Sequence, residues 1–421
     1  MKILRRVLNF TGVVLFCLSI SLSAAAPAYA ATTDNVGSWT ASPSLVPVDQ
    51  MTALYSGTAT YNGYIYKLGG LAGFREFVYY APLSPDGSVG TWQLTTSVPN
   101  RVFSAGTFIN DGYIYNIGGR DGIGEYDDVN YAPLNSNGTI GSWITSGNNL
   151  PQAFGIGGVS VNNDFVYVTG GYSSSASYAM DTVYYAPLNP DGSVGAWITS
   201  GNNLPNGLNS NRSAVYNDYL YVVGGMDMSG MVDTVYYAPL NPDGSVGSWT
   251  LSPSSLPVGT ALQSVVAYDG NLYSLGGATN NSVLDTVQYA PINADGSLGS
   301  WVASASSLPV ELYGAAASLY QGYIYLTGGS NNSTGDSNTV YYASLAPAST
   351  TVGGVSPAPA AAAGTLPLSL PQAPSTGSGS FRTAPQYSAI FLSLASTFFV
   401  VAGLTLLFAY RPLGTYTERK H

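Results

Sequence analysis

The chain has 421 residues and a net charge of −10, and only 8% of its side chains are charged, whereas glycine and tyrosine are abundant. Between residues 31 and 387, six Lys and Arg face 21 Asp and Glu, which leaves a net charge of −15. A surface this acidic argues against nucleic acid and anionic lipid as partners, because both require basic side chains. So few Lys and Glu among so many β-forming residues favour an all-β, turn-rich body.

Residues 1–30 predict a secretory signal peptide. Basic residues near the N-terminus precede a mostly apolar run, and the small residues Ala28 and Ala30 suit cleavage before Ala31. An uncleaved N-terminal anchor is the alternative. Cys17, the only cysteine of the chain, lies in this segment, so the mature protein is expected to have neither disulfides nor thiol chemistry.

A repeated sequence pattern fills residues 31–347. It is marked by every tryptophan of the chain, spaced 51 to 54 residues apart: Trp39, Trp92, Trp143, Trp197, Trp249 and Trp301. It is also marked by six glycine pairs: Gly69 and Gly70, Gly118 and Gly119, Gly170 and Gly171, Gly224 and Gly225, Gly276 and Gly277, Gly328 and Gly329. Such self-similarity predicts that copies of one supersecondary unit, set side by side, form the body of the protein.

Each copy is expected to hold four short β-strands. The expected strands of one copy are residues 213–216, 219–225, 234–240 and 247–251. Tight turns rich in Asn, Asp and Gly join the first strand to the second and the third to the fourth. The phrase NPDGSVGSW at 241–249, which recurs with small changes in four other copies, is expected to form the second of these hairpins. Its tryptophan is expected to pack one sheet against its neighbour.

The order of these marks resembles the kelch repeat: an apolar strand ending in Gly-Gly, then an aromatic strand, then a tryptophan. The resemblance implies a six-bladed β-propeller in which each repeat forms one four-stranded blade. The last copy lacks its fourth strand, and a spare strand surrounds Trp39 near the N-terminus. We therefore expect the N-terminal strand to close the ring and leave no orphaned sheet edge. Tandem β-sandwiches are the competing architecture. The APLNPDGSVG insert makes this hairpin longer than the usual kelch one.

The C-terminal part of the chain predicts a surface anchor. Residues 348–387 are rich in Pro, Ala, Ser and Gly and predict an extended stalk. The apolar run 388–410 is long enough for a transmembrane helix, and the basic tail 411–421 would remain in the cytoplasm, with the body outside the cell. The segment Ala373-Pro-Ser-Thr-Gly377 resembles the Leu-Pro-x-Thr-Gly sorting signal of bacterial wall proteins, with Ala in place of Leu. Wall sorting is therefore the alternative to a membrane anchor.

The variable loops predict where a ligand would bind. The loops after the glycine pairs and after the tryptophans share one face of a propeller, and variable loops on a rigid scaffold commonly carry binding sites. The candidate residues on this face are Phe74, Arg75, Phe103, Arg120, Tyr126, Phe154, Tyr172, Tyr178 and Tyr313. Arg101 and Arg212 share the face, at a position where kelch repeats often carry arginine for structural reasons. We expect the face to bind an extracellular protein or a glycan.

Acidic residues recur two positions before the third strand. They are Asp127, Asp181, Asp233 and Asp285, with Glu76 and Asn338 in the remaining copies. Their oxygen atoms suit calcium, which makes a calcium site one hypothesis. The alternative is that each carboxylate accepts backbone N–H groups and ends its own loop, and recurrence in every blade favours this alternative. No other cofactor is expected.

The sequence contains no recognisable catalytic motif. Its only histidine, His421, lies behind the predicted transmembrane helix. The copper chemistry of galactose oxidase, an enzyme built on a kelch-type propeller, is therefore excluded, as are histidine triads and zinc sites. A sialidase-like, glycan-cleaving enzyme that uses Arg75, Arg120, Arg212 and Glu311 is the alternative. The favoured function is a cell-surface binding or adhesion module rather than an enzyme.

Overall fold

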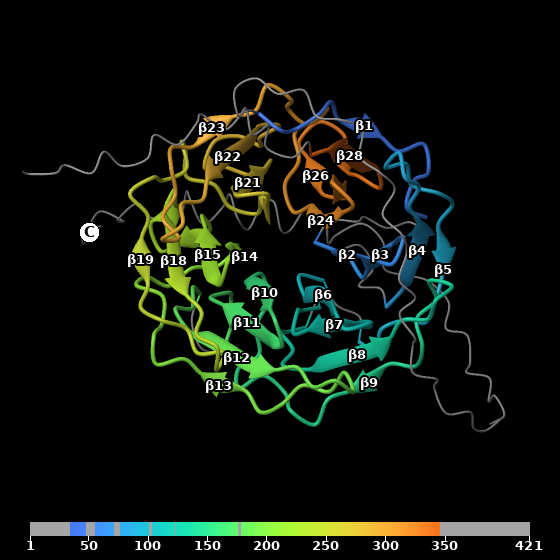
Figure 1. The fold of residues 1–421 in the computed structure, drawn as a ribbon, viewed down its shortest axis with the longest axis horizontal. Helices are drawn as coiled ribbons and strands as arrows, with labels where there is room; N and C mark the ends of the chain where they lie inside the picture. The colour runs from blue at the N-terminus through green and yellow to red at the C-terminus, as the bar shows by residue number, and fades with distance from the viewer. Residues whose placement is uncertain are drawn as a thin grey trace, which may run out of the picture.

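The computed structural model describes residues 34–47, 55–70, 76–100, 103–121, 123–175 and 178–345. These residues form six four-stranded antiparallel sheets set around a common axis (Figure 1). The predicted all-β, six-bladed propeller is thus confirmed. The predicted signal peptide, stalk, transmembrane helix and basic tail lie outside the described ranges. Within those ranges, no helix is long and apolar enough to cross a membrane.

Each blade runs from an innermost strand beside the axis to a two-residue strand at the rim (Figure 1). The first blade consists of β2 (Gly57–Tyr61), β3 (Tyr64–Leu68), β4 (Val78–Pro82) and β5 (Gln93–Leu94). The second consists of β6 (Gly106–Asn110), β7 (Tyr113–Ile117), β8 (Val129–Pro133) and β9 (Ile144–Thr145). The third consists of β10 (Gly158–Asn162), β11 (Phe165–Thr169), β12 (Val183–Pro187) and β13 (Ile198–Thr199).

The remaining blades repeat this order, and two of them carry a small extra hairpin. The fourth blade consists of β14 (Arg212–Tyr216), β15 (Tyr219–Val223), β18 (Val235–Pro239) and β19 (Thr250–Leu251), with the hairpin β16 (Met226–Asp227) and β17 (Gly230–Met231). The fifth consists of β20 (Ser264–Tyr268), β21 (Asn271–Leu275), β22 (Val287–Pro291) and β23 (Val302–Ala303). The sixth consists of β24 (Ala316–Tyr320), β25 (Tyr323–Thr327), β28 (Val340–Ser344) and β1 (Thr40–Ala41), with the hairpin β26 (Ser330–Asn331) and β27 (Gly335–Asp336).

The N-terminal strand closes the ring, as predicted. Strand β1 pairs antiparallel with β28, so Thr40 lies opposite Tyr342. The carboxylate of Asp34 fastens the same segment to the fifth blade, because it accepts hydrogen bonds from the Ser304 hydroxyl at 2.9 Å and the Ala305 amide at 2.5 Å. The first and last strands of the domain therefore belong to one sheet, so the outer edge of β28 is paired rather than open.

The hydrophobic core lies between blades. In the described part of the chain, each core cluster combines two neighbouring sheets and one repeat tryptophan. Between the first and second blades, for example, Tyr66 and Val78 pack with Ile114 and Trp143. Five of the six indole N–H groups also donate to a backbone carbonyl of the preceding blade, at 3.0 to 3.3 Å. The predicted role of the tryptophans in joining sheets is thus confirmed.

The repeated nine-residue phrase forms a hairpin that also docks on the preceding blade. Asp243 accepts hydrogen bonds from the backbone N–H of Ser245 at 3.0 Å and from its hydroxyl at 2.6 Å, which holds the turn. Gly244 has a φ of +82°, and a Cβ at this position would lie 2.3 Å from the ring of Phe165 in the third blade. Only glycine leaves room for this ring and adopts this backbone conformation without strain. The phrase recurs because the five blades that carry it turn and dock in the same way.

A closed ring of backbone hydrogen bonds, here called the axial ring, surrounds one end of the axis. Each blade contributes the residue two positions before its innermost strand: Tyr55, Ser104, Ile156, Ser210, Leu262 and Gly314. Each N–H donates to the carbonyl of a neighbouring member at 2.7 to 3.3 Å, and the sixth bond returns to the first blade. All six φ angles lie between +55° and +65°. A positive φ is costly for a β-branched residue such as Ile156. The hydrogen bonds of the closed ring therefore hold this residue in a strained backbone conformation.

A lysine lies in the core of the first blade. Lys67 in β3 is only 8% exposed, and its ammonium donates to the Gly69 carbonyl. Burial lowers the pKa of Lys67 from its usual 10.5 to about 8, because a charged ammonium loses hydration there. The corresponding positions of the next two blades carry the uncharged residues Asn116 and Val168.

Lys67 should therefore make stability depend on pH. Below about pH 8 both the folded and the unfolded protein bind this proton, and the folded state bears the full cost of the buried charge. Between about pH 8 and 10.5 the folded protein has lost the proton and the unfolded chain has not, so the free energy of unfolding rises with pH. Lys67→Met is expected to be more stable than wild type at pH 7, by up to about 3 kcal/mol. Denaturant unfolding of both proteins from pH 7 to 10 checks this. The difference between their free energies of unfolding should become smaller as the pH rises, and a difference that stays constant would contradict the prediction.

Candidate functional site

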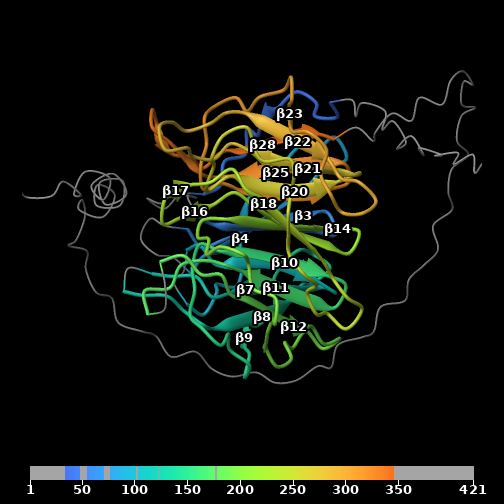
Figure 2. The same ribbon diagram turned by 90° about the vertical axis from the view of Figure 1, so that its left-hand side faces the viewer.

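The predicted binding residues can now be placed on the propeller. The described candidates lie in the loops after the glycine pairs and in the segments that lead into the innermost strands, and short β-bridges join these two kinds of loop. Such bridges pair Phe103 with Arg120 and Tyr126 with Phe154. The hairpin β16–β17, which follows the glycine pair of the fourth blade, marks this face at one end of the blades in Figure 2. Phe74, Arg75 and Arg101 lie outside the described residues.

Arg120 is held between two aromatic rings. Its guanidinium carbon lies 5.7 Å from the centroid of the Phe103 ring and 5.1 Å from that of Tyr172, which are cation–π distances. Its Nη2 lies 3.5 Å from Oε1 of Glu125. The other carboxylate oxygen of Glu125 accepts hydrogen bonds from the N–H and the hydroxyl of Ser174, in the loop of the next blade. The second and third blades are thus joined at this face by one arginine and one glutamate.

Aromatic contacts extend this arrangement in both directions. Tyr55 stacks on Phe103, with ring centroids 6.2 Å apart and an interplanar angle of 28°. Tyr172 meets Tyr178 edge-on, with centroids 5.9 Å apart, and the Tyr178 hydroxyl lies 3.1 Å from the Met226 sulfur of the fourth blade. The resulting row is here called the aromatic arc: Tyr55, Phe103, Arg120, Tyr172 and Tyr178. It crosses three blades and reaches a fourth.

The candidate side chains differ in how much of their surface is exposed to solvent. Phe103 and Phe154 are 3% and 1% exposed, so they support the face from beneath. The Tyr126 hydroxyl donates to the Asp121 carboxylate at 2.7 Å, and this bond raises the pKa of Tyr126 to about 12. Tyr313 is partly buried and exchanges backbone hydrogen bonds with Ser330.

Three apolar side chains at the tips of adjacent loops project into solvent. Ile123, Tyr178 and Met228 are 96%, 44% and 84% exposed and belong to the second, third and fourth blades. They are here called the loop-tip residues. Sequence reasoning found Tyr178 but missed Ile123 and Met228, as well as Tyr55. Unusual apolar residues in short polar loops were the signal for Ile123 and Met228, whereas Tyr55 has no local signal because its role depends on the ring that six blades form.

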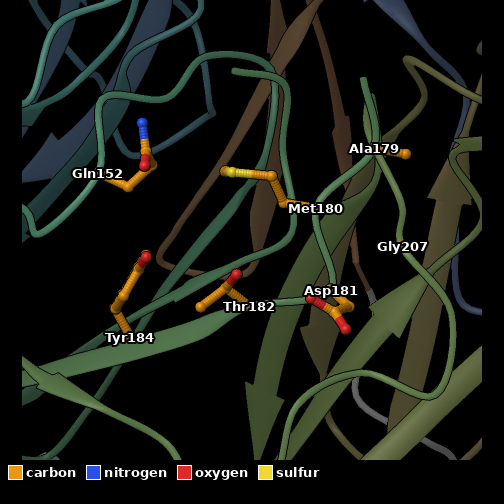
Figure 3. Close-up of a pocket in the computed structure, with 7 residues that line it drawn as sticks. All are labelled: Gln152, Ala179, Met180, Asp181, Thr182, Tyr184 and Gly207. Atoms are coloured by element: carbon orange, nitrogen blue, oxygen red, sulfur yellow. The ribbon is translucent and has the colours of Figure 1, made fainter. Parts of the chain in front are cut away.

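A pocket of about 310 Å³ lies beside the third blade on the same face. Its wall consists of Gln152, Ala179, Met180, Asp181, Thr182, Tyr184 and Gly207. Figure 3 shows Gln152, Met180, Thr182 and Tyr184 gathered around one space. The Gln152 amide nitrogen is already bonded to the hydroxyls of Ser173 and Ser175, at 3.1 and 2.9 Å. Hydroxyl, amide and carboxylate groups beside the apolar side chains of Ala179 and Met180 suit a ligand that carries hydroxyl groups.

The aspartates that recur two positions before the third strand make a recurring hydrogen bond through their backbone carbonyls. The carbonyls of Asp127, Asp181, Asp233 and Asp285 each accept the N–H of a leucine in the following loop, at 2.8 to 2.9 Å. These carbonyl bonds hold each loop to its own blade. Within the described ranges, no three His, Cys, Asp or Glu side chains gather closely enough to hold a metal ion.

Comparisons with known proteins agree with the architecture. No family model matches the chain. Over 111 residues it is 35% identical to the Kelch-like protein 33 of Homo sapiens; this segment is 26% of the present chain and 19% of that relative. The solved structure of YjhT is similar with a TM-score of 0.57 and 16% identity, over 71% of this chain and 95% of that one. The glycine pairs, the tryptophans and the closed ring of blades thus identify a six-bladed β-propeller of the kelch type.

Proposed function

We propose that the protein is a binding module whose ligand contacts the face that carries the aromatic arc and the loop-tip residues. A propeller fold supports a binding or scaffold role, because it presents many loops on a rigid base. The observation that carries the proposal is the continuity of the aromatic arc from Tyr55 to Tyr178 across neighbouring blades. Its aromatic and arginine side chains are of the types that dominate binding energy at protein surfaces.

The face is organised before a ligand arrives. Arg120 is stacked on two rings and paired with Glu125, and Glu125 is in turn bonded to Ser174. Side chains that are already ordered lose little conformational entropy when a ligand covers them. The arc therefore supplies a fixed base, and the exposed loop tips above it supply the surface to be covered.

The chemistry of the face supports an extracellular protein or a glycan as the ligand. Large exposed apolar side chains such as Ile123 and Met228 are typical of surfaces that bind a partner, since covering them removes apolar area from water. The pocket beside Thr182 would serve a glycan, because its hydroxyl and amide groups match sugar hydroxyls. The predicted signal peptide and C-terminal anchor would present this face at the cell surface, in keeping with an adhesion role.

Replacing the three loop-tip residues tests the proposal. The ligand is first identified by applying the wild-type protein to protein and glycan arrays. The variant Ile123→Ser, Tyr178→Ser, Met228→Ser is then expected to bind it at least about 30-fold more weakly, because it removes the exposed apolar contacts. Surface plasmon resonance measures the dissociation constants. For a glycan ligand, Thr182→Val should also weaken binding.

A matched control separates this face from the rim. Leu94, Ile144 and Leu251 are 57%, 46% and 56% exposed on the outermost strands. The triple variant Leu94→Ser, Ile144→Ser, Leu251→Ser removes a comparable exposed apolar surface and should bind as wild type does. Equal losses in both variants, or a loss only in the rim variant, would overturn the choice of face. Turnover of chromogenic glycosides by the wild type would instead support the enzymatic alternative.

A further inference from the structure

The third blade differs from both of its neighbours at the start of its third strand. In the second and fourth blades, an asparagine that follows a Val-Pro or Leu-Pro pair in the preceding connection bonds to this part of the blade. The amide of Asn100 donates to the carboxylate of Asp128, the residue directly before β8, at 2.7 Å. The amide of Asn206 donates to the hydroxyl of Tyr236, the second residue of β18, at 2.9 Å. In both blades the connection is thus fastened to a polar group at the start of the third strand.

The corresponding residue before the third blade, Gln152, bonds elsewhere. Its amide nitrogen donates to the hydroxyls of Ser173 and Ser175, in the loop that follows the glycine pair. The two polar groups at the start of the third strand are here Thr182, directly before β12, and Tyr184, its second residue. Between them and Gln152 lies the pocket of about 310 Å³. The third blade therefore has an open space where its neighbours have a hydrogen bond.

The groups around this space match the surface of a sugar ring. In Figure 3 the hydroxyls of Thr182 and Tyr184 point toward the space beside Gln152. A hydroxyl both donates and accepts hydrogen bonds, and the carboxamide oxygen of Gln152 accepts them. Met180, which is 4% exposed, contributes apolar surface to the same wall. A sugar ring combines hydroxyl groups with an apolar face of C–H groups, so both kinds of surface find a counterpart in the pocket.

Charge and volume restrict which sugars fit. Among the described residues that line the pocket, Asp181 is the only charged one, and the chain has a net charge of −10. A sugar that carries a carboxylate would meet this like charge without a lysine or arginine in the described wall to balance it. An uncharged sugar avoids this repulsion. The pocket volume lies at the lower end of the roughly 300–1,000 Å³ found for small-molecule sites, which suits one sugar ring rather than an oligosaccharide.

We propose that this pocket binds a single uncharged sugar unit. The hydroxyls of Thr182 and Tyr184 and the carboxamide of Gln152 are its hydrogen-bond partners, and Asp181 excludes acidic sugars. The inference rests on the proposed function, because the pocket belongs to the proposed binding face, and it names the class of ligand that this part of the face selects.

The methyl glycosides of glucose, galactose and mannose serve as neutral probes, and glucuronic acid and N-acetylneuraminic acid as acidic ones. Saturation-transfer NMR and calorimetric titration of the full chain, at constant ionic strength, measure binding. At least one neutral glycoside should bind saturably, and the acidic sugars at least about tenfold more weakly. Thr182→Val and Tyr184→Phe each remove a hydroxyl with little change of shape, so each should weaken neutral binding at least about tenfold. Asp181→Asn should leave neutral binding close to wild type and strengthen the binding of glucuronic acid.

Gln152→Asn provides a second test that removes no hydroxyl from the pocket. The variant places in the third blade the residue that both neighbouring blades carry. Its amide is expected to bond to the Tyr184 hydroxyl, as the amide of Asn206 bonds to that of Tyr236. This bond would occupy the space for the sugar, so the neutral glycoside should bind more weakly while the melting temperature without sugar stays close to wild type.

The loop-tip triple variant distinguishes failure of this site from failure of the binding face. It keeps every residue that lines the pocket and should bind the neutral glycoside as wild type does. Absence of saturable binding by all three neutral glycosides, wild-type binding by both Thr182→Val and Tyr184→Phe, or equal binding of neutral and acidic sugars would overturn the sugar site and leave the binding face standing. Unchanged binding of the array ligand by the triple variant would instead overturn the binding face and leave the sugar site standing.

Discussion

Deletion of residues 31–44 is expected to lower the melting temperature strongly and to cause aggregation. The deletion removes β1, so the edge of β28 at Tyr341 and Tyr342 loses its partner strand and becomes available to other molecules. It also removes Trp39, which packs in the core between the fifth and sixth blades and donates to the Ser306 carbonyl at 3.2 Å. Truncation of a fully buried aromatic side chain typically costs about 3–5 kcal/mol. Trp39 is partly buried, so its loss contributes part of that amount, and the loss of the strand adds to it.

An internal blade offers the control for this experiment. Trp143 has the same place in the second blade as Trp39 has in the sixth, and donates to the Thr96 carbonyl at 3.0 Å. Trp143→Ala should lower the melting temperature while the protein stays monomeric, because no sheet edge is opened. The deletion should lower it further and yield larger species in size-exclusion chromatography. A deletion variant that melts like the wild type would show that closure by β1 contributes nothing to stability.

The closure of the ring by the N-terminal strand could be predicted from the sequence, because it follows from the number of strands in each repeat. The repeat leaves one unit without a fourth strand and one strand without a unit, and only pairing β1 with β28 resolves both. Strand types and turns followed in the same way, since Asp-Gly and Asn-Gly turns specify hairpins locally. The axial ring could not be foreseen, because residues as different as Tyr55, Ile156 and Gly314 occupy equivalent places in it.

The binding face was predictable in part. Loops after the glycine pairs supplied Arg120, Tyr172 and Tyr178, and the structure brings these residues together with Phe103. The sequence did not indicate that Phe154 is almost fully covered, because burial in these loops depends on how closely neighbouring blades approach. It also favoured a structural role for Arg212, whose Nη1 donates to the Asn211 carbonyl at 3.0 Å.

The glycine pairs are a local sequence pattern, but contacts with the next blade are part of the reason why glycine is required there. In the described part of the chain, the second glycine of several pairs donates its N–H to a carbonyl in the loop that leads to the following blade. For Gly225 the acceptor is Thr260, at 2.8 Å. The first glycine passes so close to the same carbonyl that a Cβ on Gly224 would lie 2.3 Å from the Thr260 oxygen. Glycine at the first position is thus required by the contact between blades as well as by its φ of +53°.

Gly224→Ala is accordingly expected to destabilise the protein by more than backbone strain alone, by about 3 kcal/mol or more. The added methyl group must displace the Thr260 carbonyl and so disrupt its hydrogen bond with Gly225. Gly270→Ala is the matched control, since Gly270 also has a positive φ, +77°, but a Cβ there would meet no atom within 4 Å. It should cost only about 1 kcal/mol from strain. Denaturant unfolding of both variants gives the difference, and equal losses would show that the close approach of the blades is not what requires glycine at Gly224.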